Sequence, residues 1–96
     1  MANININTTE VRRQARLLKE ASTQLINGTV KPMDEVNQSI QSIWTGDTAR
    51  LFLKYADELK TNLKSNAQDI NEISVFLTEA CQAIERAERE AKAKIK

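Results

Sequence analysis

Side chains able to do chemistry are few in this chain. It has no histidine and one cysteine, Cys81, so a thiolate nucleophile would lack an imidazole base and a soft metal would lack companion ligands. The 13 acidic residues are spread along charged segments, whereas a di-iron carboxylate site would normally add Glu-x-x-His pairs. We therefore predict no enzyme activity, no catalytic residue, no metal and no cofactor. Cys81 is expected to be a small buried side chain.

The charge balance argues against two classes of partner. The chain carries 14 Lys and Arg against 13 Asp and Glu, a formal net charge of +1, which gives little attraction to nucleic acid or to an anionic membrane. No run approaches the ~20 consecutive apolar residues that span a bilayer. The first ten residues lack a basic segment followed by an apolar core. We expect no transmembrane segment and no cleavable signal peptide.

The composition favours long helices, because the whole chain has two Gly and one Pro. A first helix is predicted over about 8–43. Asn7 is suited to cap its start, with Glu10 reaching back to the cap amide. Ile6 is then placed to pack on Val11 as a hydrophobic staple.

Gly28 and Pro32 interrupt the pattern of this first helix. A proline ring crowds the carbonyl four residues earlier, and here that carbonyl belongs to a glycine, which eases the strain. We predict a kink near 28–32. A true break between Asn27 and Lys31 is the alternative.

The segment 44–47 is predicted to reverse the chain. Gly46 can adopt a left-handed backbone conformation, and Asp47 is suited to cap the next helix. Beyond it, no Gly or Pro occurs, so a second helix of about 45 residues is predicted over about 48–92.

Apolar residues recur in steps of three and four on one face of each helix. The first helix adds the small residues Ala15 and Ser22 to this face, and its pattern slips by one residue between Thr29 and Met33. We predict that this apolar stripe forms the core of the hairpin and the contact between two hairpins. Its members are Val11, Leu18, Leu25, Val36, Ile40, Ile43, Phe52, Leu59, Leu63, Ile70, Ile73 and Leu77.

Further large side chains flank the stripe, among them Leu17, Tyr55 and Phe76. The resulting apolar face is wider than a contact between two helices can cover. We therefore predict an all-α fold with one domain over 1–96, an antiparallel two-helix hairpin that dimerises into an elongated four-helix bundle.

Trp44 is the one tryptophan of the chain and stands at the predicted turn. A large aromatic there either covers the end of the hydrophobic core or stays partly exposed. Because loops and tryptophan anchors are both over-represented in binding, a recognition role is weighed equally with the structural one.

The central Trp44-x-Gly46 motif, flanked by two long amphipathic helices in a chain of about one hundred residues, resembles the WXG100 family of ESAT-6-like proteins. The resemblance covers the whole chain. It implies a protein made in the bacterial cytoplasm and secreted, without a cleavable signal peptide, by a type VII system as a folded helical dimer. It also implies the secretion ATPase as a partner.

The family has a C-terminal helical pattern that Ile84, Glu88, Ala91 and Ile95 fit in spacing. Many members have Tyr at the first position, where this chain has Ile84. The resemblance implies that Trp44 and Gly46 of one hairpin lie near this segment of the partner and form a composite surface for the secretion ATPase.

Several functions would use the same helical surfaces. The leading one is a homodimeric type VII substrate, export partner or adaptor. A heterodimer with a WXG100-like paralogue and an escort chaperone for a larger secreted toxin are alternatives. A polymerising subunit, such as a type III secretion needle protein, would instead need surfaces that associate without closing.

Overall fold

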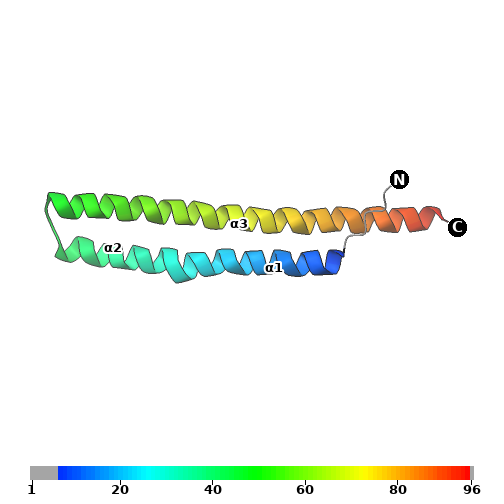
Figure 1. Cartoon of the computed structure of the whole chain (residues 1–96), viewed down its shortest axis with the longest axis horizontal. Coiled ribbons are helices and arrows are strands. Elements are labelled where there is room, and N and C mark those ends of the chain that lie inside the picture. Colours follow the sequence, from blue (N-terminus) through cyan, green and yellow to red (C-terminus); the bar gives the residue numbers. More distant parts are fainter. Residues whose placement is uncertain (1–6, 96) are drawn as a thin grey trace.

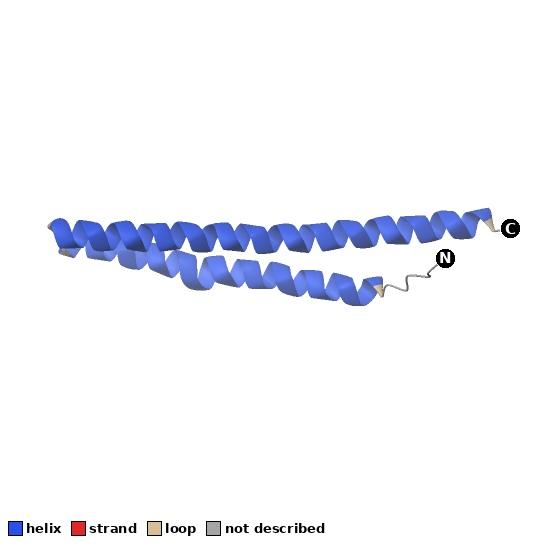
Figure 2. Cartoon of the chain, turned by 45° about the horizontal axis from the view of Figure 1, so that its top comes forward, coloured by secondary structure: helices blue, strands red, loops and turns tan. Residues whose placement is uncertain are grey.

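The computed structural model describes residues 7–95 and is helical almost throughout. Its elements are α1 (Thr8–Leu25), a π-helical turn η1 (Ile26–Val30), α2 (Lys31–Ile43) and α3 (Asp47–Lys94). α1, η1 and α2 run along one side, and α3 returns antiparallel to them (Figures 1 and 2). The molecule measures 77 × 20 × 16 Å, so it is a long rod two helices wide. The all-helical hairpin predicted from the sequence is confirmed.

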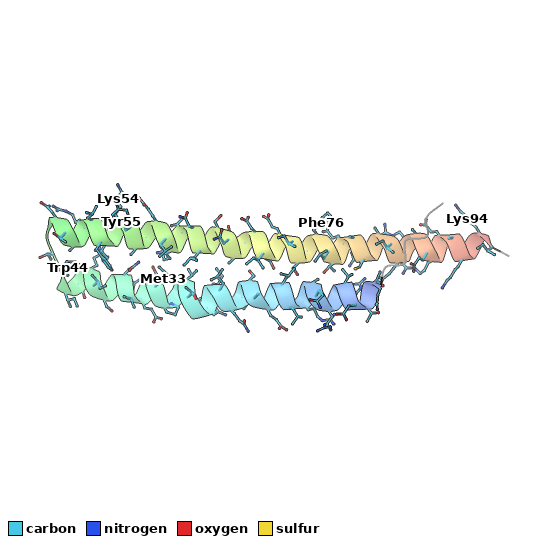
Figure 3. The ribbon with its side chains drawn as sticks, viewed as in Figure 1. Met33, Trp44, Lys54, Tyr55, Phe76 and Lys94 are labelled. Atoms are coloured by element: carbon cyan, nitrogen blue, oxygen red, sulfur yellow. The ribbon has the colours of Figure 1, made fainter. Side chains whose placement is uncertain are left out.

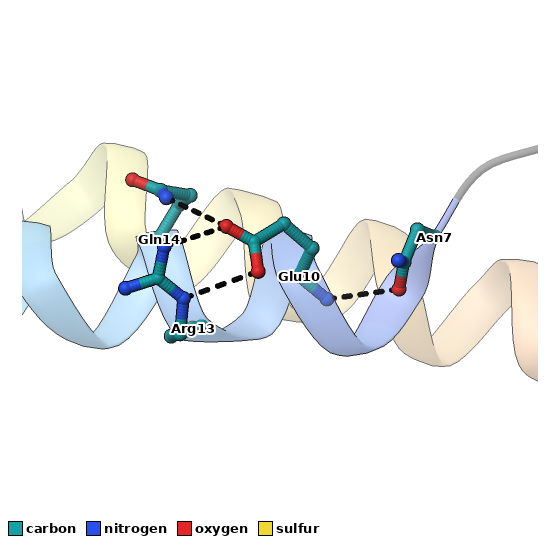
Figure 4. A network of polar contacts seen from close by, with 4 residues as sticks. All are labelled: Asn7, Glu10, Arg13 and Gln14. Carbon is teal, nitrogen blue, oxygen red and sulfur yellow. Dashed lines mark hydrogen bonds and ion pairs between the residues drawn. The ribbon is translucent and has the colours of Figure 1, made fainter.

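The start of α1 is fixed by polar contacts of Asn7. Its side-chain oxygen accepts a hydrogen bond from the Glu10 amide at 3.1 Å, as an N-cap does. The Glu10 carboxylate does not return to the cap amide as predicted: it accepts from Arg13 at 2.7 Å and from Gln14 at 2.9 Å (Figure 4). Ile6, the proposed staple residue, lies outside the described residues.

η1 carries the helix through the Gly28–Pro32 segment without a break in its backbone. The amide of Lys31 donates to the carbonyl of Ile26, five residues earlier, which is the π pattern. The wider turn gives room for the proline ring and absorbs one extra residue. This explains the one-residue slip of the apolar pattern, because the residues after η1 remain on the same side of the hairpin.

The reversal between α2 and α3 depends on one glycine. Trp44 ends α2 in an extended conformation, and Gly46 then has φ +108°, a value that side-chain-bearing residues rarely adopt. Gly46 is itself the residue before the first helical position of α3, so the prediction that Asp47 caps this helix is wrong. Asp47 is the first helical residue, and its carboxylate pairs with Arg50.

Small residues bring α1 and α3 together. The residues buried along the contact between the two sides of the hairpin, here called the seam, are Ala15, Ser22, Val30, Ala49, Ala67, Ser74 and Cys81. Ala67, Ser74 and Cys81 recur every seven residues, so they stay on one face of a supercoiled helix. Cys81 is buried, as expected, and its thiol donates to the Thr8 carbonyl at 3.8 Å.

Two serine hydroxyls cross-link the seam. Ser22 Oγ donates to the Ala67 carbonyl at 2.6 Å, and Ser74 Oγ donates to the Ala15 carbonyl at 2.7 Å. Each buried hydroxyl is thereby satisfied by the opposite helix. Together the two bonds fix how far α3 can slide along α1.

The predicted stripe does not form the centre of the hairpin, and that part of its assignment is corrected. None of its twelve residues is buried. Half-buried members are Val11, Leu18, Leu25, Ile40, Leu63, Ile70 and Leu77, and exposed members are Val36, Ile43, Phe52, Leu59 and Ile73. On α3 the seam is rotated by one residue from the prediction, because Ser74 is buried where Ile73 was expected. The prediction chose large apolar side chains for the seam, whereas the close contact between the helices has room only for small ones.

Candidate protein-interaction surface

One long edge of the hairpin presents large apolar side chains to solvent. This apolar edge consists of Leu17, Met33, Val36, Phe52, Tyr55, Leu59, Ile73 and Phe76. The α3 members share a face because Ile73 lies two heptads after Leu59, and Phe76 lies three heptads after Tyr55. Leu59 is 53% exposed, Ile73 51% and Phe76 68%. Patches of this kind mark interaction sites on soluble proteins.

The apolar edge is hollowed next to η1. A groove runs between α2 and α3 there, lined mainly by carbon, and its walls include Pro32, Met33, Val36, Phe52, Tyr55 and Leu59. The side chains in Figure 3 place Met33 on α2 and Tyr55 on α3, at the end of the rod nearer the turn. The lining of this groove is suited to contact with an apolar side chain.

The opposite edge is polar. Glu85 lies four residues after the seam residue Cys81, and Ile73 lies one residue before the seam residue Ser74. At 3.6 residues per turn, these two offsets place Glu85 and Ile73 on opposite sides of the seam. Arg12 Nη2 lies 2.5 Å from Glu85 Oε1 on this polar edge. The Arg12 guanidinium, helped by Thr8, lowers the pKa of the Glu85 carboxyl. The charges of Arg12 and Glu85 are therefore paired within the chain.

A second ionic group continues the polar edge toward the turn. Lys60 Nζ lies 2.8 Å from Asp34 and 3.1 Å from Asp57. The hydrogen bond to Asp34, followed by that to Asp57, raises the pKa of Lys60. The two edges thus differ in kind: ion pairs join the helices on one side, and uncovered apolar groups line the other.

The hairpin tip, residues 43–46, carries the motif tryptophan. The Trp44 ring packs against Phe52 with ring centroids 5.7 Å apart and a tilt of 45°. It remains 42% exposed, and neighbouring Ile43 is 82% exposed. Trp44 is therefore partly covered by Phe52 and partly exposed, and its recognition role stays a prediction.

The C-terminal pattern lies where α3 outruns α1. Thr8, the first residue of α1, contacts Cys81, and α3 continues to Lys94 (Figure 1). Residues 86–94 are called the overhang, and all of them are exposed. Ile84 is half-buried beside α1, Glu88 and Ala91 stand on the overhang, and Ile95 follows it. Within one chain, this segment and Trp44 are at opposite ends of the rod.

Among the described residues, no three acidic or cysteine side chains gather where they could hold a metal ion. Within residues 7–95, no helix has the length and apolar character needed to cross a membrane. What the described surface offers is contact, through the apolar edge, the tip and the overhang.

Sequence reasoning missed four seam residues, Val30, Ala49, Ala67 and Ser74. Two of these, Ala67 and Ser74, could have been found. The signal available for them was the repeat of small residues at positions 67, 74 and 81, matched by Ala15 and Ser22 on the first helix. Small residues at heptad spacing favour close helix contact, although they carry little hydrophobic weight.

The model of the WXG100 family, described as proteins of 100 residues with WXG, matches residues 3–89 and so covers most of the chain. No curated protein and no solved structure matches the chain.

Proposed function

Because the chain belongs to the WXG100 family, we propose that it is exported by a type VII secretion system as a folded helical dimer. Proteins of this family are small, ESAT-6-like and secreted by type VII systems, and they are generally not enzymes. They typically pair with paralogues. In this proposal the chain acts as one hairpin domain that serves as substrate, export partner or adaptor through protein contacts alone.

The apolar edge is the observation that carries the proposal. Its large side chains are left uncovered by their own chain, while the polar edge is closed by ion pairs. A second hairpin laid against this edge would bury Leu59, Ile73 and Phe76 and complete a four-helix bundle. Such burial offsets the entropy cost of ordering a rod two helices wide.

A single apolar edge favours a closed pair over a polymer. A C2 dimer uses the same patch on both subunits, whereas an open filament needs two different complementary surfaces. The partner that best fits is a second copy or a WXG100-like paralogue. An escort role for a larger toxin would use the same edge on a helical domain of that toxin.

We further propose that the tip and the overhang form the surface read by the secretion ATPase. Trp44 is partly exposed beside Phe52, and Glu88, Ala91 and Ile95 are exposed at the far end of α3. Ile84 would position the start of this segment, and Gly46 would hold the tip in its reversed conformation. In an antiparallel dimer these two elements, remote within one chain, come together from different chains.

Export of a Trp44→Ala variant by a type VII-competent bacterium tests the proposal. We expect the secreted fraction to fall, with the cytoplasmic amount and the dimer mass unchanged. Leu51→Ala is the matched control, because Leu51 is another exposed apolar residue near the tip but lies on the outer face of α3. Equal secretion of the Trp44 variant and the control variant would contradict the recognition role.

A further inference from the structure

One row of the apolar edge contains a polar interruption. Positions 52, 59, 66, 73 and 80 of α3 recur every seven residues and hold Phe, Leu, Asn, Ile and Ala. Leu59 and Ile73, the two neighbours of Asn66 in this row, are each about half exposed, and Asn66 is exposed as well. Asn66 is therefore the one polar member of this row, while Asn62 and Asp69 lie between Tyr55 and Phe76 in the neighbouring row.

The groove and the most exposed ring of the apolar edge are placed evenly about Asn66. Tyr55, in the groove wall, precedes Asn66 along α3 by nearly the same stretch of helix by which Phe76 follows it. Phe76 is 68% exposed, so most of its side chain is uncovered in the hairpin (Figure 3). A two-fold axis through Asn66 would bring Phe76 of each copy to the groove of the other.

We propose that Asn66 lies on the two-fold axis of the homodimer and fixes its antiparallel register. This inference rests on the dimer proposed above and names its occupant, a second copy of this chain. On the axis a residue meets its own counterpart, so the two Asn66 amides can donate and accept reciprocally. A slip of one heptad would instead set each amide against Leu59 or Ile73 and bury both amides without partners.

The antiparallel direction follows from the groove and the ring. A parallel dimer in register would also pair the two Asn66 residues, but it would set Phe76 against Phe76 and one groove against the other. Only the antiparallel arrangement fills both grooves. It also sets Phe52 opposite the small Ala80 of the second copy, which matches a large side chain with a small one.

This register has a consequence for the proposed export surface. Gly46 and Arg86 are equally far from Asn66 along the sequence, one before it and one after it. At ~1.5 Å per residue, both are about 30 Å from the axis. The tip of one copy therefore reaches the start of the overhang of the other. Asn66 would thus align two surface elements that it never touches.

Thiol cross-linking tests the register. Leu59→Cys and Ile73→Cys are made separately in a Cys81→Ser background and treated with a cross-linker of ~8–10 Å, the spacing of packed helices. In the proposed register two Leu59 positions are ~21 Å apart along the axis, whereas Leu59 and Ile73 of different copies are level. We expect the mixed proteins, after unfolding and refolding together, to cross-link at least about fivefold more than either alone.

The role of Asn66 itself is tested by adding Asn66→Leu to both cysteine variants. The dimer mass should persist, because an apolar residue suits the interface, but the preference for mixed cross-links should be lost as other registers become populated. An unchanged preference would overturn the assignment to Asn66, and strong self-cross-linking with Asn66 present would overturn the register. A monomeric mass for the parent protein would overturn the dimer and this inference together, so the two failures are distinguishable.

Discussion

Replacing Ile73 by aspartate should separate the two hairpins, and the neighbouring Val75 provides a matched control. Both side chains are β-branched and similarly exposed, at 51% and 47%. They flank the seam residue Ser74, so they point to opposite sides of α3. Ile73 lies on the apolar edge and Val75 on the solvent side. The same charge introduced at the two sites therefore differs only in whether a partner covers it.

The expected loss of dimerisation free energy follows from the part of the Ile73 side chain that is still exposed in the single hairpin. Full burial of an isoleucine side chain contributes about 1.5–3 kcal/mol, and half of it is already covered in the hairpin, so about 1 kcal/mol per protomer is lost. An unpaired carboxylate at the interface adds a desolvation cost of roughly another 1–3 kcal/mol. With two sites per dimer, the sum is at least ~4 kcal/mol, or about a thousandfold in Kd.

Sedimentation equilibrium over a range of concentrations measures this Kd, and circular dichroism checks that the helices persist. We expect Ile73→Asp to be a helical monomer at concentrations where Val75→Asp is still dimeric. Dimers of equal affinity in the two variants would refute the assignment of the contact to the apolar edge.

Three further predictions concern the hairpin itself. Ser74→Ala should lower the free energy of unfolding by about 0.5–1.5 kcal/mol, because its hydroxyl no longer donates to the Ala15 carbonyl; chemical denaturation measures this. Gly46→Ala should cost about 1–3 kcal/mol, since alanine is strained at φ +108°, and an unchanged denaturation midpoint would count against this account of the turn. Arg13, above all, lowers the pKa of Glu10 from 4.5 to about 2, so the stability from this pair is complete above pH 4.5 and is lost as the pH falls toward 2. The Tm difference between wild type and Glu10→Gln should therefore shrink over that interval.

The helices could be predicted from residues that act locally. Asn7 caps α1 through a hydrogen bond with the residue three positions later, and Gly46 permits the reversal through its own backbone conformation. Neither feature depends on distant parts of the chain. The type of helix distortion next to Pro32 was harder to predict from the sequence. A kink and a π turn both relieve the same clash, and only the one-residue slip of the apolar pattern pointed to an inserted residue.

The centre of the hairpin was harder to predict because two contact surfaces compete for the same helix. On α3 the seam residue Ser74 and the edge residue Ile73 are adjacent, and a pattern weighted by hydrophobicity selects the larger one. The sequence therefore indicated where apolar side chains gather without distinguishing contact within the chain from contact with a partner. Hydrogen bonds from Ser22 and Ser74 to carbonyls 45 and 59 residues away depend on the tertiary fold.

The mass of the wild-type protein in solution shows whether a second hairpin covers the apolar edge. Light scattering across a hundredfold range of concentration, alone and with a WXG100-like paralogue, makes the measurement. One chain has a mass of 10.9 kDa, and we expect a constant mass of two hairpins, about twice that value. A mass of 10.9 kDa under both conditions, or one that grows without limit as concentration rises, would contradict it.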